Sequence, residues 1–365
     1  MATHKLKKCD VIFNTIEREI KTDKYMFGFK LPSDKELCKR FNASRPTVAR
    51  ALNELESVGL VERKIGSGTF VKYNSPGLKK RFKFGLLVPG LGETEIFDQI
   101  CGHLSHLAQT ENFKLVWYGS MDSGPKERAA KLEQLAYRYI EEKVDGVFFT
   151  PLELVAEKEQ INLRITEILK SHNINIVLID RDIVDFPLRS EYDFVSLDNF
   201  RTGYVIAQHL IEQGAKRIAF VAKPFSAPSV FIRMAGYREA VIGSGLTCNE
   251  NDVHIETPLD ADTISKILRG KPDAVVCAND STAAILMQGL LKKKVSVPDE
   301  IMVTGIDDLP YSKYLCPTLT TYQQPYKEIA KAALETMVHR IENEDSPAKG
   351  IQLAGKIIVR KSTQK

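Results

Sequence analysis

Short apolar runs alternate with helical stretches between residues 84 and 306, and this rhythm constrains the fold more than any other feature of the chain. The runs are almost continuously apolar, as expected of strands that are buried on both faces. Amphipathic stretches separate them, such as the one that carries Ile206, Leu210 and Ile211. The predicted strands are 84–88, 115–118, 146–150, 174–179, 194–197, 218–222, 253–256, 274–278 and 301–306. This alternation predicts parallel, doubly wound α/β sheets.

The predicted strands are too many for one small sheet. The chain has 365 residues, enough for two or three domains, and its hydrophobic content of 43% is ordinary for a globular protein. We therefore expect two α/β lobes with a cleft between them. Ligands of such folds lie at the carboxyl ends of the strands, so this cleft is the expected binding site.

Residues 31–71 follow a different pattern, which begins with a strong helix-start signal. Ser33 stands ahead of an acidic turn, and Glu36 three residues later has the spacing of a capping box. In a capping box the two side chains accept each other's backbone N–H groups, which the first helical turn otherwise leaves unpaired. The sequence therefore predicts a first helix over 34–41.

A second helix is predicted after Ser44, with Pro46 in its first turn, where a missing N–H costs nothing. Gly59 is placed to end this helix as a C′ glycine. Two short strands within 60–71 then form a hairpin whose turn carries glycines and cations. Helix, turn, helix and β-wing in this order predict a DNA-binding unit whose second helix enters the major groove.

The charge distribution supports this interpretation independently. Residues 1–83 contain 19 Lys and Arg against 9 Asp and Glu, a net charge of +10. The remaining residues hold 32 against 38, a net charge of −6. A basic head on a mildly acidic body is the electrostatic pattern expected of a DNA-binding module.

Residues 8–73 resemble the winged helix-turn-helix of the GntR family. The resemblance rests on Gly28, Leu31-Pro32-Ser33, Glu36-Leu37, Phe41, Ser44-Arg45, Thr47-Val48, Ala51-Leu52, Leu55, Gly59-Leu60-Val61 and Gly66-Ser67-Gly68-Thr69-Phe70-Val71. It implies that double-stranded operator DNA is a partner. By the same resemblance, the DNA contacts are made by Lys35, Ser44, Arg45 and Thr47, and Gly66 lies at the tip of the wing.

One position departs from the family pattern. The family usually carries an arginine directly after the Thr-Val pair, but here that position is Ala49 and the arginine stands at Arg50. Arg50 is therefore a further candidate for contact with DNA. The sequence leaves open whether it replaces the missing arginine.

Residues 74–82 are turn-rich and basic, without apolar periodicity, and they predict a linker. We expect a DNA-binding domain over 1–73 and a second domain over 83–365. The chain has no run of 18 apolar residues, and its six cysteines are scattered without a Cys-x-x-Cys pair. These features predict a cytoplasmic protein with reduced thiols, no zinc site and no membrane partner.

Signatures of common enzymes are missing. The run Pro89-Gly90-Leu91-Gly92 begins like a dinucleotide fingerprint, but Glu95 stands where the third glycine would be. There is no Walker loop, Gly-x-Ser-x-Gly elbow or His-Glu-x-x-His motif. We therefore expect no catalytic residues, cofactor or metal. The alternatives are an enzyme fused to a winged head, which lacks its signature here, and a free transport-type binding protein, which the basic head disfavours.

Polar residues follow several predicted strands directly. Asp180 and Arg181 come after one strand, Asn279 and Asp280 after another, and the run 305–308 ends in two aspartates. Carboxylate and amide oxygens accept hydrogen bonds from hydroxyl groups, so these positions suit a small hydroxylated ligand. The alternative is that the acids only cap the following helices, and this alternative is strongest for Asp280.

Two further side chains complete this candidate site. Arg233 comes shortly after the predicted strand 218–222, and its planar guanidinium can donate two parallel hydrogen bonds. Phe97, early in a predicted helix, could stack on the apolar face of a sugar ring.

Residues 83–361 resemble the LacI-type effector-binding and dimerisation domain, which is itself similar to periplasmic sugar-binding proteins. The resemblance rests on Val144-Asp145-Gly146, 176–180, 195–199, Gly203, His209-Leu210, Gly214, Arg233-Met234-Ala235-Gly236-Tyr237, 274–280, Val297-Pro298-Asp299, Gly305-Ile306-Asp307-Asp308 and 317–321. It implies a homodimer that binds a small-molecule effector. Arg233 and Asp280 would bind this effector, with Asp180, Asn279 and Phe97 as neighbours. Residues 93–97 depart from the family's usual Asn-Pro-Phe-Phe.

Together the two resemblances imply a repressor of sugar-utilisation genes that a small neutral sugar releases from DNA. Two winged heads of a dimer would reach half-sites in successive major grooves of a palindromic operator. Two alternatives stay open at this point. The ligand could act as a corepressor, or it could be a sugar phosphate or nucleoside.

Overall fold

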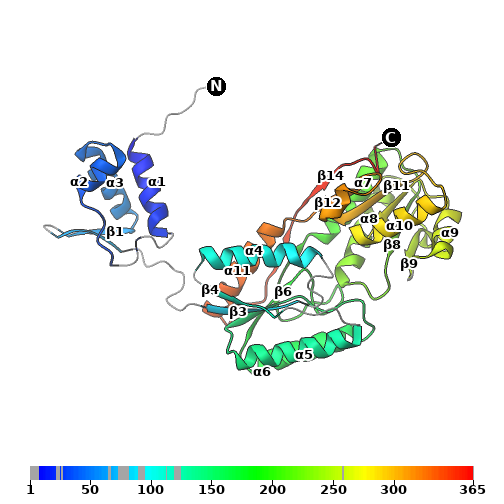
Figure 1. Cartoon of the computed structure of the whole chain (residues 1–365), viewed down its shortest axis with the longest axis horizontal. Coiled ribbons are helices and arrows are strands. Elements are labelled where there is room, and N and C mark those ends of the chain that lie inside the picture. Colours follow the sequence, from blue (N-terminus) through cyan, green and yellow to red (C-terminus); the bar gives the residue numbers. More distant parts are fainter. Residues whose placement is uncertain are drawn as a thin grey trace. The chain divides into compact units, whose positions relative to one another are not determined.

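The computed structural model describes residues 8–21, 25, 28–64, 67–72, 82–88, 95–111, 113–118, 125–256 and 259–364 (Figure 1). The chain separates into two compact units, residues 1–81 and 82–365, which we call the head and the body. Gly66 and all of the predicted linker except Phe82 lie outside the described residues.

The head is a helical unit with an antiparallel hairpin. Its described elements are α1 (Lys8–Lys21), α2 (Asp34–Phe41), α3 (Arg45–Ser57), β1 (Val61–Lys64) and β2 (Gly68–Val71). The capping box predicted at Ser33 is confirmed, because its side chain accepts the Glu36 N–H and the Glu36 side chain accepts the Ser33 N–H. Gly59 adopts a φ of +77° directly after the C-cap of α3, as predicted for a C′ glycine.

One face of α3 anchors the head's core. Val48, Ala51, Leu52 and Leu55 are buried at helical spacing and pack with apolar side chains of α1 and α2. The wing strands pair in antiparallel register, with Val61 opposite Val71. Because the buried face of α3 is fixed in this way, the first turn of the helix is directed to solvent.

The first lobe of the body is built on a parallel sheet. Its strand order is β13-β7-β6-β5-β3-β4. The strands are β3 (Phe82–Leu87), β4 (Phe113–Val116), β5 (Gly146–Phe149), β6 (Asn175–Ile179), β7 (Asp193–Leu197) and β13 (Gly350–Leu353). The helices are α4 (Glu95–Thr110), α5 (Pro125–Glu141), α6 (Lys158–Ser171) and α11 (Tyr326–Glu342). Helices α4 and α11 cover one face of the sheet and α5 and α6 the other (Figure 1).

The second lobe repeats this plan. Its strand order is β14-β12-β11-β10-β8-β9, and only β14 is antiparallel to its neighbour among the described strands of this sheet. The strands are β8 (Ile218–Ala222), β9 (Val253–Ile255), β10 (Ala274–Cys277), β11 (Met302–Asp307), β12 (Thr320–Gln323) and β14 (Lys356–Ile358). The helices are α7 (Asn199–Glu212), α8 (Pro228–Gly243), α9 (Ala261–Arg269) and α10 (Asp280–Lys292). The predicted two-lobed α/β architecture is confirmed.

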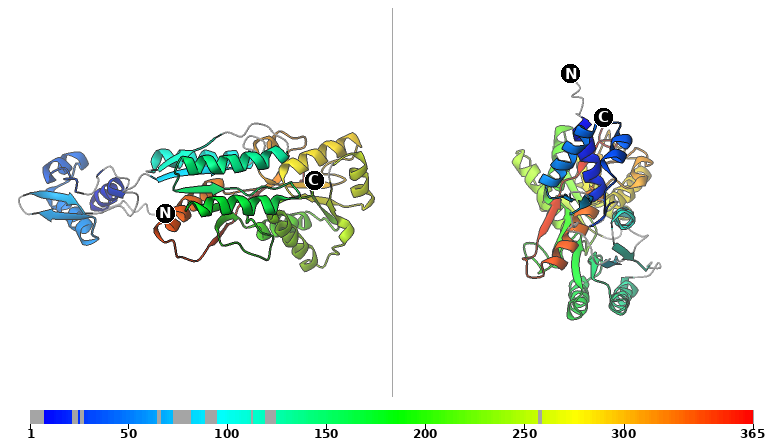
Figure 2. Two further views of the ribbon diagram at one scale, coloured as in Figure 1. Left: turned by 90° about the horizontal axis from the view of Figure 1, so that it is seen from below. Right: turned by 90° about the vertical axis from the view of Figure 1, so that its left-hand side faces the viewer.

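Neither lobe is a continuous piece of the chain. The chain passes from one sheet to the other after β7, after β12 and between β13 and β14. The two lobes lie end to end along the body, and these connections run between them (Figure 2). Among the described residues, no helix has both the length and the apolar character needed to cross a membrane.

Helices α7 and α8 lie in unusually close contact in the second lobe. A Cβ added at Gly203 of α7 would lie 1.9 Å from the carbonyl oxygen of Arg233 in α8. A Cβ added at Gly236 would lie 2.0 Å from the carbonyl oxygen of Phe200 in α7. The two glycines therefore allow the backbones to touch, and this contact sets the position of Arg233.

Candidate functional site

The start of α3 presents the predicted DNA contacts. Ser44 and Arg45 are exposed, and Thr47 is half-buried with its hydroxyl 2.7 Å from the Ser44 hydroxyl. Lys35 is exposed in the first turn of α2. Among the described residues, Arg45 makes no ion pair or side-chain hydrogen bond, so its guanidinium is available to a ligand in solution.

Arg50 lies on a different flank of α3. Five residues separate it from Arg45, which corresponds to a rotation of about 140° around the helix. Its guanidinium pairs with Glu54 at 3.1 Å, and the other oxygen of Glu54 accepts a hydrogen bond from the Cys9 thiol at 3.7 Å. An arginine at position 49 would instead stand only about 40° from Arg45 around the helix.

We therefore predict that Arg50→Ala weakens operator binding only slightly, by about threefold or less. The variant removes one exposed ion pair, which solvent screens strongly, and leaves the Arg45 flank of α3 unchanged. Fluorescence anisotropy with a labelled operator fragment measures the effect. A loss as large as that of an Arg45 variant would show that Arg50 does replace the arginine missing at Ala49.

The wing is held against the helices by Arg63 of β1, a residue that the sequence did not single out. Its guanidinium donates to Asn53 of α3 at 2.7 Å and lies 3.4 Å from the Asp34 carboxylate of α2. Its backbone N–H donates to the Glu56 carboxylate at 2.8 Å. Arg63 thus joins the wing to both helices and fixes where the wing lies relative to α3.

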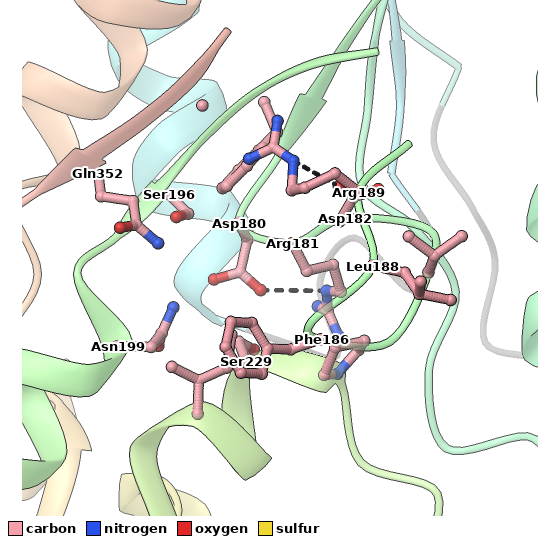
Figure 3. A pocket seen from close by; sticks show the side chains of 15 residues that line it. Asp180, Arg181, Asp182, Phe186, Leu188, Arg189, Ser196, Asn199, Ser229 and Gln352 are labelled. Atoms are coloured by element: carbon pink, nitrogen blue, oxygen red, sulfur yellow. Dashed lines mark ion pairs between the residues drawn. The ribbon is translucent and has the colours of Figure 1, made fainter. Parts of the chain in front are cut away.

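The body contains a pocket of about 180 Å³ whose wall is shared by the two lobes (Figure 3). The first lobe contributes the loop that follows β6 and residues of β7 and β13. The second lobe contributes the start of α7 and of α8. The lining residues are Asp180, Arg181, Asp182, Val184, Phe186, Leu188, Arg189, Phe194, Ser196, Asn199, Pro228, Ser229, Ile232, Gly350 and Gln352.

Two of the predicted effector residues, Asp180 and Arg181, lie in this wall. Arg181 is only 4% exposed. Its guanidinium lies 2.7 Å from the Glu153 carboxylate and 3.0 Å from the Asp180 carboxylate. Burial alone would lower the pKa of Arg181, but these two carboxylates raise it. Phe97 does not line the pocket. It lies beneath the Arg181 guanidinium, whose central carbon is 5.6 Å from the centre of the Phe97 ring.

Arg233 does not line the pocket but is hydrogen-bonded to a residue that does. Its side chain is buried in the second turn of α8 and donates to Asn199 at 2.7 Å and to the carbonyl of Ala278 at 2.8 Å. Asn199 in turn lines the pocket. Arg233 therefore orients a wall residue of the pocket.

Asn279 and Asp280 lie outside the pocket wall. Asn279, rather than Asp280, caps α10 by accepting the Thr282 N–H at 2.9 Å. The fully buried Asp280 carboxylate accepts the Thr321 hydroxyl at 2.5 Å and the Leu309 N–H at 2.9 Å. The alternative that Asp280 only caps its helix is wrong, because its oxygens accept hydrogen bonds from more distant parts of the second lobe.

Asp307 is a buried group that the sequence marked only as part of a polar run. One of its carboxylate oxygens accepts from Gln324 at 2.7 Å, and the other has no hydrogen-bond partner among the described residues. Burial raises the pKa of Asp307 well above the usual range of a carboxyl group. The Arg233 guanidinium lowers this pKa, and the Asp280 carboxylate raises it further. Asp280, Asp307 and Arg233 thus form one electrostatic cluster behind the pocket.

The buried aspartates predict a pH dependence of stability. Burial raises the pKa of Asp280 to about 7, although the Thr321 and Leu309 hydrogen bonds lower it. The folded chain then keeps a proton that the unfolded chain loses near pH 4, so stability falls as the pH rises from about 4 to about 7.

Asp280→Asn should remove the part of this dependence that Asp280 contributes. Its amide oxygen can still accept the Leu309 N–H, and its NH₂ can donate to Thr321. We expect the body of the variant to melt a few degrees higher than the wild type at pH 8 and about equally at pH 5, as measured by calorimetry. If the melting temperatures of the two proteins changed with pH in the same way, the raised pKa of Asp280 would be contradicted.

Both the head and the body are similar to known protein families. Residues 9–71 match the model of bacterial regulatory proteins of the gntR family, and residues 207–363 match that of the periplasmic binding protein-like domain. The chain joins a GntR-type DNA-binding head to a periplasmic-binding-protein-like body. The sequence resemblances to these two classes are thereby confirmed.

Relatives of this GntR-headed chain include named repressors. The arabinose metabolism transcriptional repressor of Halalkalibacterium halodurans is 28% identical, and the match covers 96% of each chain. The HTH-type transcriptional repressor PurR of Vibrio campbellii is 29% identical, and that match covers 62% of this chain and 66% of PurR, just under two-thirds of its length.

Solved structures share the fold of the body. The transcription regulator CcpA of Lactococcus lactis has a TM-score of 0.66 at 21% identity, covering 78% of this chain and 100% of that structure. A LacI family regulator from Enterococcus faecium with bound ribose has a TM-score of 0.61 at 23% identity. That match covers 77% of this chain and 98% of that structure.

Proposed function

We propose that this GntR-headed chain is a repressor of sugar-utilisation genes and that a small neutral sugar in the interlobe pocket releases it from its operator. The observation that carries the proposal is the shared wall of the pocket. Asp180 comes from the first lobe, whereas Asn199 and Ser229 come from the second. A ligand that contacts all three stabilises one relative position of the lobes, which is how binding in the body can alter a dimer's grip on DNA.

The charges of the pocket favour a neutral ligand. Its wall carries two arginines and two aspartates. Arg181 pairs with Asp180 at 3.0 Å, and Arg189 lies 3.4 Å from Asp182. No uncompensated cation is therefore offered to a phosphate, whereas hydroxyl groups can bond to the amides and hydroxyls of Asn199, Ser229 and the other polar wall residues.

The size of the pocket favours a monosaccharide. Pockets for drug-sized ligands measure roughly 300–1,000 Å³, and this one measures about 180 Å³. The full-length relative named as an arabinose metabolism repressor supports the same ligand class. Within the proposal, Asp180 and Arg181 contact the sugar, and Phe97 and Arg233 support Arg181 and Asn199 from behind. Asn279 and Asp280 lie in the second lobe outside the pocket wall.

The head supplies the DNA contacts in this proposal. Arg45 and Thr47 read bases and phosphates at the start of α3, Lys35 and Ser44 bind the DNA backbone, and Arg50 is an auxiliary cation. A homodimer places two heads on a palindromic operator. The sugar relieves repression only if it binds the DNA-incompetent state more tightly than the competent one. A DNA target implies a cytoplasmic protein, and we assign the chain no catalytic role.

Melting temperatures against a panel of pentoses, hexoses, sugar phosphates and nucleosides test the ligand class. A neutral sugar at a hundred times its dissociation constant should stabilise the body by about 2.7 kcal/mol. The operator can be selected from random oligonucleotides with the purified chain, and the same sugar should then release it. A response to phosphate esters or nucleosides alone would overturn the neutral-sugar proposal, and tighter DNA binding with sugar would make the ligand a corepressor.

A further inference from the structure

A second set of contacts joins the lobes beside the pocket, between residues 153–158 of the first lobe and residues 225–227 of the second. The Leu154 N–H donates to the carbonyl of Phe225 at 2.8 Å. The Lys158 ammonium donates to the carbonyl of Ser226 at 2.5 Å. These bonds join the segment from the end of β5 to the start of α6 with the loop after β8, so moving the lobes apart would break them.

The backbone at this crossing is unusual. Leu154 has a φ of +60° and Phe225 a φ of +56°, in the left-handed region that few non-glycine residues adopt. The hydrogen bond between them thus joins two residues that are both held in a costly conformation. Their side chains are partly exposed, so apolar burial does not explain why the loops take this shape.

Glu153 connects the crossing to the pocket. One carboxylate oxygen accepts the Ala227 N–H at 3.0 Å, directly ahead of α8. The other lies 2.7 Å from the Arg181 guanidinium in the pocket wall. Burial would raise the pKa of Glu153, but Arg181 and the Ala227 N–H hold it below the usual range. An ionised Glu153 therefore binds a pocket residue of one lobe and the backbone of the other at the same time.

We propose that Glu153 and Lys158 form a clasp that holds the two lobes closed before any effector binds. The clasp makes no use of a ligand, because every contact in it joins two parts of this chain. Where the proposed function holds, the clasp sets effector affinity, since a ligand binds more tightly when the competent closed state is already populated. Entry of the effector then requires the clasp to open.

Hydrogen–deuterium exchange of the full-length, ligand-free protein tests the clasp. The Leu154 and Ala227 N–H groups donate to the opposite lobe, so peptides covering 151–158 and 223–229 should be protected in the wild type. Lys158→Met removes the donor to Ser226 and Glu153→Gln removes the charge that binds Arg181. We expect each variant to raise exchange in both peptides about tenfold and to leave peptides of β8 and β10 unchanged.

Lys292→Met is the matched control, because Lys292 is an exposed lysine at the end of α10 and makes no clasp contact. Its exchange should equal that of the wild type. Unprotected loops in the wild type, or protection that survives both clasp variants, would overturn the proposal. Equal gains in the control would show a general loosening of the body and would also overturn it.

An effector-binding experiment distinguishes a failure of the clasp from a failure of the proposed function on which the clasp rests. With the sugar found by thermal shift, Lys158→Met should bind about tenfold more weakly than Lys292→Met. If the loops are protected and released as expected but no sugar binds, the clasp stands and the sugar proposal fails. If a sugar binds both variants equally and the loops exchange freely, the sugar proposal stands and the clasp fails.

Discussion

Replacing Arg45 with alanine is expected to abolish specific operator recognition, with a loss of operator affinity of about 100-fold or more, and to leave effector binding unchanged. Arg45 is exposed in the first turn of α3, and among the described residues its guanidinium has no partner. An arginine that donates two hydrogen bonds to guanine contributes about 1–3 kcal/mol of discrimination. The proposed homodimer would lose this contribution at both half-sites, so the two losses would add.

Arg45→Lys is the matched control for charge. Lysine keeps the cation but lacks the planar fork that gives paired hydrogen bonds. We expect Arg45→Lys to retain most non-specific binding and its salt dependence, while losing discrimination between operator and mutated operator. Anisotropy titrations at several salt concentrations measure both properties. An Arg45→Ala protein with unchanged operator affinity and salt dependence would remove the assignment of α3 as the recognition helix.

Gly236→Ala is expected to destabilise the second lobe by at least about 3 kcal/mol, and this is the largest stability effect we predict. The new Cβ would lie 2.0 Å from the carbonyl oxygen of Phe200 and 2.9 Å from the backbone nitrogen of Tyr204. Overpacking that side chains can absorb costs about 1–3 kcal/mol. Here the obstacle is backbone, so α7 and α8 must separate and carry Arg233 away from Asn199.

Gly243→Ala in the same helix is the control. A Cβ at Gly243 would meet nothing within 4 Å, and alanine is favoured over glycine in a helix by about 1 kcal/mol. We expect this variant to be as stable as the wild type or slightly more so in urea denaturation followed by circular dichroism. If Gly236→Ala unfolded at the same urea concentration as Gly243→Ala, the close contact between α7 and α8 would be disproved.

The head could be predicted closely because its signals are local. The capping box at Ser33 and the C′ glycine at Gly59 involve residues a few positions apart, so the sequence displays them directly. The strands of the body followed from their apolar runs in the same way. Strands β12, β13 and β14 were missed because their residues are polar or half-exposed, and they become strands only by pairing with distant partners.

The pocket was only partly predictable. Asp180 and Arg181 stand directly after an apolar strand, a position with a known relation to the ligand site of such folds. Ser229 and Gln352 carry no comparable signal. They reach the pocket from a helix start in one lobe and an edge strand in the other. Their meeting depends on how the lobes close, which no short stretch of sequence records.

The interleaving of the lobes has a consequence for how the protein is made on the ribosome. The edge strand β13 completes the first sheet only when Leu353 has been synthesised, and β14 completes the second only a few residues later. The fully buried Ser362 and Thr363 follow β14 in the chain. Both sheets therefore stay unfinished at an edge until β13 and β14 have been synthesised, and open edges invite pairing with other chains. A nascent body should thus need protection from its neighbours on the same messenger, whereas the head is complete before the first strand of the body has been made.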